Sequence, residues 1–406
     1  MAKRKITLLD GAMGTNLINM GMPPGICVEN WILGHRDAVV SLQKKYIEAG
    51  AKIIYAPTFG ANPVTLKKYG TVDCEEINAE LVALSKEAAS GSGTLVAGDL
   101  STTGLMPLPY GEAVYSDYFD AFRTQAVALD KAGVDLFVIE TSSLIFEVCA
   151  AVDAVRSVSG KPVFVTYTVG KNGRTFVGDD IACCLVSLQD RGISAFGINC
   201  SEGEESVLNA LKRIAPLSRV PLIAKPNAGV PDSAGGSGGF SSSPETFAEW
   251  GKKLIEAGAS YIGGCCGTTP EHIKALDKMI PETGYEAPET GTEDENEYAC
   301  SATEIFRVER DAELPESIPC DGELMFNMPS AGEAAFCRVK IASPDDAQYL
   351  ADACMTLDRP LMISGDYASI EAGIKNYAGR CVTDPESDIT EEEKNRLKAL
   401  YGCITL

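Results

Sequence analysis

A short unit recurs along the first two thirds of the chain: a helical stretch ends in Ala-Gly, and a brief apolar run follows directly. It occurs at Ala49-Gly50, Ala132-Gly133 and Ala257-Gly258. Glycine after a helix readily takes the left-handed conformation that ends it, and an uninterrupted apolar run predicts a strand that is buried on both faces. The repeated alternation therefore restricts the chain to an α/β fold with a parallel sheet covered by helices.

Eight strands of this kind are expected before residue 265. They are predicted at 6–9, 52–55, 94–99, 135–140, 162–167, 195–199, 221–225 and 260–262. Eight strand and helix units over this length are typical of a (β/α)8 TIM barrel, with an open doubly wound sheet as the alternative. The barrel is favoured because polar residues follow the strands, where barrel active sites are built. These residues are Asp10, Thr58, Asp99, Glu140, Cys200, Asn227 and Cys265.

Charge and composition exclude several classes of function. The 406 residues carry a formal net charge of −22, which opposes binding to nucleic acid and to anionic membranes. No apolar run approaches the roughly 18 residues of a membrane span, and the run after the basic N-terminus is too short for a signal peptide. The chain has 14 cysteines, which without an export signal indicate a reducing compartment. We therefore expect a cytoplasmic protein.

The chain is longer than one core usually holds, so we expect more than one domain. Residues 1–282 form the predicted barrel, residues 283–298 an acidic linker, and residues 299–406 a small α/β domain that is too short for a second barrel. Ser343 is expected to cap the first helix of this domain. Its strands are predicted at 336–341, 360–364, 380–383 and 403–406. The Gly-rich segment 231–240 is either a solvated loop or a flap over the site.

Three cysteines lie where predicted strands end. Cys265 and Cys266 stand between glycines in the loop after the last barrel strand, and Cys200 follows the run 195–199. Adjacent residues of a strand face opposite ways, so neighbouring thiols reach one ion only in a loop that turns freely. We interpret the three thiols as zinc ligands. The alternatives are a strained disulfide between Cys265 and Cys266 and small buried side chains. The latter interpretation is the one we give to Cys27, Cys74, Cys149, Cys183 and Cys184.

The number and type of these ligands favour catalysis over a structural role. Structural zinc sites have four protein ligands, commonly in C-x-x-C pairs, whereas catalytic sites have three and leave one position open. The chain lacks that pairing, and with two histidines it cannot form a mainly imidazole site. Three thiolates leave zinc with a net charge of about −1 and make it soft, which suits binding of a substrate thiol as its thiolate. The bound sulfur would then attack an electrophilic carbon.

An anion site is expected near the N-terminus. The run 6–9 ends at Asp10, and Gly14 and Thr15 open the helical stretch that follows. Free backbone N–H groups at the start of a helix attract anions. A substrate carboxylate is therefore predicted to lie on Gly14 and Thr15.

Five motifs follow one another along the chain. They are Asp10-Gly11-Ala12-Met13-Gly14-Thr15, Glu140-Thr141, Gly197-Ile198-Asn199-Cys200-Ser201, Pro226-Asn227-Ala228-Gly229 and the run from Gly263 to His272. In this order they resemble the homocysteine S-methyltransferase family, and most closely the homocysteine-binding module of cobalamin-dependent methionine synthases. The resemblance implies a barrel that holds zinc on Cys200, Cys265 and Cys266. It also implies that homocysteine sulfur fills the open position and accepts a methyl group.

The resemblance assigns roles to residues around the metal. Asp10 and Glu140 would hold the amino group of homocysteine, the Gly14 and Thr15 amides its carboxylate, and Asn227 would lie near the zinc. Independently of the resemblance, a zwitterionic amino acid requires one carboxylate and one anion site in such a barrel mouth.

Two stretches depart from the family pattern. Where relatives often have Thr-Asn-Thr-Phe, the chain has Ala56-Pro57-Thr58-Phe59, so a polar contact is lost or replaced. Residues 299–406 resemble a shortened form of the pterin-binding barrel that follows in methionine synthases. The usual motifs of that barrel are replaced by Ser364-Gly365-Asp366 and Phe326-Asn327-Met328-Pro329. We therefore expect that this chain does not bind methyltetrahydrofolate, and we find no cobalamin-binding module in it.

These observations predict a zinc-dependent homocysteine S-methyltransferase that forms methionine. The expected methyl donor is methylcobalamin carried by a separate corrinoid protein, with S-methylmethionine or a betaine as alternatives. A different class remains open, namely a sensor or docking protein in which the metal captures a thiol but catalyses nothing. The altered Ala56-Pro57 stretch and the shortened second domain motivate this second hypothesis.

Overall fold

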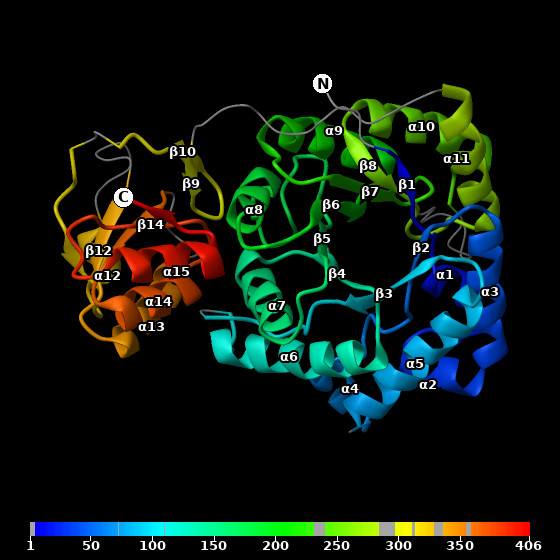
Figure 1. Ribbon diagram of the computed structural model, residues 1–406, viewed down its shortest axis with the longest axis horizontal. Helices are drawn as coiled ribbons and strands as arrows, with labels where there is room; N and C mark the ends of the chain where they lie inside the picture. The colour runs from blue at the N-terminus through cyan, green and yellow to red at the C-terminus, as the bar shows by residue number, and fades with distance from the viewer. Residues whose placement is uncertain are drawn as a thin grey trace.

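A computed structural model describes residues 5–71, 73–108, 110–230, 240–283, 297–310, 313–328, 336–354 and 359–406. Within these ranges the chain forms an eight-stranded barrel and a smaller C-terminal region (Figure 1). Segment 231–239 and nearly all of the expected linker at 283–298 lie outside the described residues. Among the helices of the described ranges, none combines the length and apolarity that a membrane crossing requires.

The barrel consists of eight parallel strands. They are β1 (Thr7–Leu8), β2 (Ile53–Tyr55), β3 (Leu95–Leu100), β4 (Leu136–Ser142), β5 (Val163–Tyr167), β6 (Ala195–Cys200), β7 (Leu222–Pro226) and β8 (Ala259–Ile262). Strand β1 pairs with β8, and a bridge between Leu9 and Ile53 joins the end of β1 to β2. The sheet therefore closes on itself. The predicted barrel is confirmed, and the open doubly wound sheet is excluded.

Helices surround the strands and cover the outside of the barrel (Figure 1). They are α1 (Gly14–Asn19), α2 (Val28–Gly34), α3 (Arg36–Glu48), α4 (Pro63–Lys68), α5 (Cys74–Ala89), α6 (Tyr115–Ala132), α7 (Ile145–Val158), α8 (Ile181–Leu188), α9 (Glu204–Ile214), η1 (Ala215–Leu217), α10 (Pro244–Glu256) and α11 (Pro270–Thr283). Gly50, Gly133 and Gly258 have φ values of 110°, 78° and 110°. These positive values are the conformation predicted for glycines that end helices α3, α6 and α10.

Side chains alternate between the barrel interior and the layer beneath the helices. In β4, Leu136 and Val138 point inward and pack with Phe164 and Ile223, whereas Phe137 belongs to the outer core. None of these side chains is more than 4% exposed. Because both faces of the strand are buried, its sequence is a continuous apolar run instead of an alternating one.

The C-terminal region contains a hairpin and a parallel sheet. The hairpin pairs β9 (Tyr298–Cys300) with β10 (Ile305–Arg307). The sheet contains β11 (Ile318–Pro319), β12 (Cys337–Lys340), β13 (Leu361–Ser364), β14 (Val382–Thr383) and β15 (Ile404–Thr405), paired in that order. Its helices are α12 (Leu324–Asn327), η2 (Pro344–Ala347), α13 (Gln348–Cys354), α14 (Tyr367–Lys375) and α15 (Glu391–Tyr401). The four predicted strands are confirmed as β12 to β15, while β11 and the hairpin were not expected.

Two features of this region bear on the predictions made for it. Its five parallel strands pair in sequence order, in agreement with the expected small α/β domain. Ser343 precedes η2, and the Asp346 carboxylate accepts hydrogen bonds from the Ser343 N–H at 2.9 Å and hydroxyl at 3.0 Å. The first helical turn therefore begins where the sequence indicated.

Buried charged groups join the C-terminal region to the barrel. Arg191, which follows α8, donates hydrogen bonds of 2.8 Å and 3.0 Å to Asp153 of α7. Its guanidinium also lies 5.3 Å from the ring centroid of Tyr401 in α15. On the other side of the junction, Arg380 pairs with Asp190 at 2.6 Å. The ion pair that crosses between the two regions is therefore Arg380 with Asp190, whereas Arg191 and Asp153 both belong to the barrel and their pairing holds Arg191 against Tyr401.

Loss of the buried pair should destabilise the protein strongly. Arg191→Met leaves the Asp153 carboxylate buried without its partner, so we expect the free energy of unfolding to fall by about 3–5 kcal/mol. Lys131→Met is the matched control, because Lys131 pairs with Glu75 where the two side chains are 60% and 62% exposed. Its loss should cost less than about 1 kcal/mol. Urea titration followed by circular dichroism measures both values, and equal losses would contradict the stabilising role given to the buried Arg191–Asp153 pair.

Candidate active site

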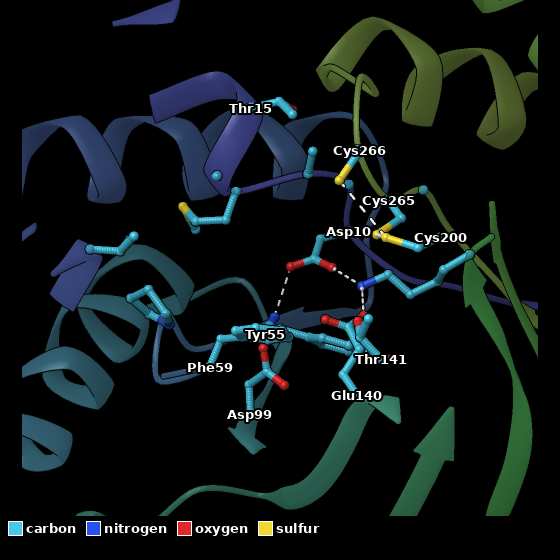
Figure 2. A pocket seen from close by; sticks show the side chains of 18 of the residues that line it. Asp10, Thr15, Tyr55, Phe59, Asp99, Glu140, Thr141, Cys200, Cys265 and Cys266 are labelled. Atoms are coloured by element: carbon cyan, nitrogen blue, oxygen red, sulfur yellow. Dashed lines mark hydrogen bonds and ion pairs between the residues drawn. The ribbon is translucent and has the colours of Figure 1, made fainter. Parts of the chain in front are cut away.

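Three thiols meet at the C-terminal end of the barrel. Cys200 is the last residue of β6, and Cys265 and Cys266 follow β8. The Cys200 sulfur lies 2.7 Å from that of Cys265 and 3.8 Å from that of Cys266, and all three sulfurs lie within 4.8 Å of one another. Figure 2 shows them together at one edge of a pocket. The structure thus brings together the three cysteines that the sequence singled out as metal ligands.

The other cysteines discussed above are placed differently. The following five cysteines are buried free thiols: Cys27, Cys74, Cys149, Cys183 and Cys184. Within the described residues, the only group of three or more cysteine, histidine or acidic side chains close enough to hold a metal is Cys200 with Cys265 and Cys266. The metal hypothesis therefore concerns these three residues alone.

Close backbone packing explains the glycines around Cys265 and Cys266. The Gly264 N–H donates to the Asp10 carbonyl at 3.0 Å, and the Cys265 N–H donates to the Pro226 carbonyl at 2.8 Å. A Cβ atom at Gly264 would lie 2.4 Å from the Thr268 hydroxyl oxygen, so only glycine fits there. The Thr268 hydroxyl in turn donates to the Cys265 carbonyl at 2.7 Å. Contacts from β1, β7 and the start of α11 therefore fix the direction of both thiols.

Hydrogen bonds within the cluster divide its protons unequally. Donation from Cys200 and Cys265 lowers the pKa of the Cys266 thiol. The Cys200 thiol donates to both neighbours, and its hydrogen bond to Cys265, followed by its hydrogen bond to Cys266, raises its pKa. Cys266 is therefore the thiol of the cluster that loses its proton most readily. A soft divalent cation that displaces the remaining protons would find its three sulfur ligands already converged.

A cavity of about 290 Å³ opens beside the sulfurs. Its apolar wall is formed by Val28, Ile32, Ala56, Pro57 and Phe59. Its charged wall is formed by Asp10, Asp99, Glu140 and Lys225. This volume is at the lower end of the roughly 300–1,000 Å³ of small-molecule sites, so it suits a ligand the size of an amino acid.

Lys225 was not expected at this site. Its side chain is 3% exposed, and its Nζ lies 3.1 Å from Asp10 Oδ1 and 3.3 Å from Glu140 Oε1. The face of the Tyr55 ring is 3.5 Å away, measured to its centroid. The two carboxylates that the resemblance assigned to the substrate amino group thus already bind a cation of the protein, as the dashed lines in Figure 2 show. A lysine inside an otherwise apolar strand was the signal that could have indicated this role.

Burial dominates the electrostatics of the charged wall. It raises the pKa of Asp10 although Lys225 lowers it, and it raises the pKa of Glu140 to about 7. Burial, and next the charge of Glu140, raise the pKa of Asp99 well above its usual range. For Lys225, burial lowers the pKa, but Asp10 and Glu140 outweigh it and raise the pKa well above the usual value. Burial therefore weakens the acids of this wall, while the charges of Asp10 and Glu140 favour the protonated form of Lys225.

The remaining expected residues fall into two groups. Gly14 and Thr15, at the start of α1, line the cavity. Asn227 and Thr58 are not among the described residues that line it. The Asn227 side chain donates from Nδ2 to the Ser201 carbonyl at 2.9 Å, and the Thr58 hydroxyl bonds to the backbone of β3 at 2.8 Å and 3.0 Å. Both therefore support the ends of strands and do not face the cavity.

Asn199 connects the thiols to the end of β4. Its Nδ2 donates to Thr141 Oγ1 at 2.7 Å and to the Cys265 sulfur at 3.7 Å, and its Oδ1 accepts from the Thr141 N–H at 3.1 Å. Thr141, Cys200 and Ser201 have φ values of 59°, 52° and 66°. Residues other than glycine seldom adopt this left-handed conformation. The thiol edge of the site is therefore both strained and tied together by hydrogen bonds.

The raised pKa of Glu140 predicts a pH-dependent stability of the metal-free protein. Its folded pKa is about 7 and its ordinary value 4.5, so between these pH values the unfolded state binds fewer protons than the folded state. The free energy of unfolding is therefore highest below pH 4.5, and it falls by up to about 3 kcal/mol as the pH rises to 7. In urea titrations the wild type should lose this much relative to Glu140→Gln across that window. Parallel pH courses for the two proteins would contradict the prediction.

Comparisons with known proteins agree with this geometry. The sequence model of a family described as homocysteine S-methyltransferase matches residues 7–280. Methionine synthase of Mycobacterium leprae (strain TN) is 29% identical over 295 residues, which cover 68% of this chain and 24% of that protein. The Mycobacterium tuberculosis (strain ATCC 25618 / H37Rv) methionine synthase is 28% identical over 295 residues, with 68% and 25% covered. The chain therefore spans about a quarter of the length of these relatives.

Solved structures of the homocysteine methyltransferase MmuM from Escherichia coli have the same fold. The oxidized form gives a TM-score of 0.57 at 24% identity and covers 67% of this chain and 95% of its own. The metallated form gives a TM-score of 0.56 at 24% identity, and the match covers 68% of this chain and 96% of that structure. Since the matched residues 7–280 make up more than half of the chain, this protein belongs to the homocysteine S-methyltransferase family.

Proposed function

We propose that this protein transfers a methyl group to the sulfur of homocysteine and so forms methionine. The observation that carries the proposal is the convergence of Cys200, Cys265 and Cys266 within 4.8 Å at the edge of a small cavity. Membership of the family supports the same reaction class. The substrate sulfur would approach the cluster from the cavity.

The donor set fits zinc. Zinc–sulfur bonds of about 2.3 Å in a tetrahedral site place the sulfurs roughly 3.8 Å apart. Cys200 and Cys266 already have a separation of 3.8 Å, and the Cys265 sulfur is close enough to reach the same ion after a small shift. Zinc held by these residues would lower the pKa of an added thiol, which is about 8.5 when free, and so make its sulfur a nucleophile at neutral pH.

The cavity suits a zwitterionic substrate with an aliphatic chain. We assign the substrate amino group to the acidic wall, which consists of Asp10, Asp99 and Glu140, and the carboxylate to the Gly14 and Thr15 amides at the start of α1. The apolar wall would cover the methylene groups and exclude water from the sulfur. Asn227 would act from behind the cluster by holding the Ser201 carbonyl.

The methyl donor that we propose is methylcobalamin on a separate corrinoid protein, with S-methylmethionine or a betaine as alternatives. The resemblance of the sequence motifs to cobalamin-dependent methionine synthases supports the corrinoid donor, and methionine synthases are among the relatives of the chain. Neither His35 nor His272 is among the described residues that line the cavity. Attack by a thiolate that has already lost its proton needs no histidine base, so this lining is compatible with methyl transfer to sulfur.

Removal of one thiol should abolish metal binding. We expect Cys200→Ala to weaken zinc binding by at least about a hundredfold, since the loss of outer partners alone changes metal affinity by 10–100-fold. Cys149→Ala is the matched control, because Cys149 is a buried free thiol of the same barrel outside the cluster. It should bind zinc like the wild type. Zinc content after dialysis against a competing chelator gives the comparison, and a Cys200→Ala protein with full zinc content would refute the ligand assignment.

A methionine-formation assay tests the reaction itself. Zinc-loaded protein with homocysteine should form methionine when methylcobalamin is supplied, and chelation of the zinc should stop it. Parallel reactions with S-methylmethionine and a betaine identify the donor if methylcobalamin is inactive. Tight binding of zinc and homocysteine without methionine from any donor would instead indicate a thiol-binding sensor or docking protein.

A further inference from the structure

We propose that Asp99, together with Glu140, binds the ammonium group of the amino acid substrate, whereas Asp10 serves to anchor Lys225. This inference rests on the proposed function, and it reassigns one residue of the substrate site. It also predicts that the site selects thiols that carry an amino group.

Asp10 has both of its carboxylate oxygens engaged within the protein. Oδ1 lies 3.1 Å from Lys225 Nζ, and Oδ2 accepts a hydrogen bond of 2.8 Å from the Tyr55 N–H. The residue is only 3% exposed. A substrate ammonium would have to compete with a covalently tethered lysine for this carboxylate, so Asp10 is poorly suited to be its main acceptor.

Asp99 is in the opposite situation. Its carboxyl lines the cavity, the residue is 5% exposed, and Oδ1 is buried with no hydrogen-bond partner in the described part of the protein. Its backbone is held by the Thr58 hydroxyl, so β3 cannot shift to relieve the side chain. A buried polar group without a partner costs free energy. A ligand in the cavity would supply the missing partner.

The neighbourhood of Asp99 favours a cation as that ligand. Figure 2 shows Asp99 and Glu140 projecting into the same side of the pocket, and the charge of Glu140 is the largest charge effect on the Asp99 pKa. Lys225 is paired with Asp10 and Glu140, and no ion pair with Asp99 is found among the described residues. Two carboxyl groups that raise each other's pKa in one cavity are stabilised by a positive group bound beside both.

An organic ammonium fits this space better than a metal ion. Calcium requires six to eight oxygen ligands, whereas Asp99 and Glu140 provide two carboxyl groups and belong to no metal-sized cluster in the described chain. An ammonium has three donors. Tyr55 also lines the cavity, and its hydroxyl is buried without a hydrogen-bond partner in the described part of the protein, so it offers a further oxygen to such a group.

The test compares two thiols that differ only in the amino group, homocysteine and 4-mercaptobutyrate. Their binding to the zinc-loaded full chain is measured by titration calorimetry. Asp99→Asn should weaken homocysteine binding by about tenfold to a hundredfold, the range for hydrogen bonds to charged groups, and should change 4-mercaptobutyrate binding less than about twofold. Asp99→Ser is the second variant if Asp99→Asn does not fold, as judged by circular dichroism.

Glu147→Gln is the matched control. Glu147 is a buried carboxyl, 4% exposed, that accepts two 2.7 Å hydrogen bonds from Thr103 and is not among the described residues of the cavity. Its replacement should leave the affinity for both thiols unchanged. Equal weakening of both thiols by Asp99→Asn, or no weakening of homocysteine, would overturn the inference while the proposed function stands. A zinc-loaded wild type that binds neither thiol would overturn the proposed function and the inference with it.

Discussion

The pairing of β7 with β6 on one side and with β8 on the other determines the geometry of the site. Cys200 lies opposite Pro226 in the register between β6 and β7, and the N–H of Cys265 donates to the carbonyl of the same proline at 2.8 Å. One residue of β7 therefore sets the separation of thiols from two strands that are not neighbours. Closure of the barrel prevents β7 from moving away from either partner. The sulfurs converge because of backbone pairing, before any ion draws them together.

The residue before that proline places a charge in the same site. Lys225 reaches Asp10 and Glu140, which come from two other strands of the barrel. Removing three charged groups from water is costly, and an apolar core of similar volume is often as stable. The cluster is therefore hard to explain by stability alone. Its position on the cavity wall, next to the thiols, supports a function in binding a charged substrate.

The sequence was sufficient for features that depend on local pattern. Apolar runs and helix-ending glycines predict the barrel, and the Gly-Gly-Cys-Cys run predicts a tight loop with two thiols. The sequence was insufficient to predict which side chains contact one another across the barrel. Lys225 was counted as part of an apolar strand, and Thr58 was expected at the mouth although its hydroxyl bonds to β3. Strand β11 (Ile318–Pro319) has two residues, which is too short to show any period.

Backbone strain is concentrated at the thiol edge of the site. In the described part of the chain, the residues other than glycine with positive φ are Thr141, Cys200 and Ser201. Each such residue costs on the order of 1–3 kcal/mol and persists only when its surroundings hold it. Here the support is identifiable, since Asn199 holds Thr141 through two hydrogen bonds and its carbonyl accepts one from the Ser201 hydroxyl at 3.0 Å.

This strain has a geometric consequence for Cys200. An extended backbone at the end of β6 would continue the alternation of the strand, whereas the left-handed turn at Cys200 and Ser201 ends it and leaves the Cys200 sulfur 2.7 Å from that of Cys265. The Asn199 side chain, which also contacts the Cys265 sulfur at 3.7 Å, links the turn to the second thiol. The free energy stored in the turn is therefore the cost of directing a thiol from β6 toward the thiols that follow β8, and Asn199 is the residue that keeps both in place.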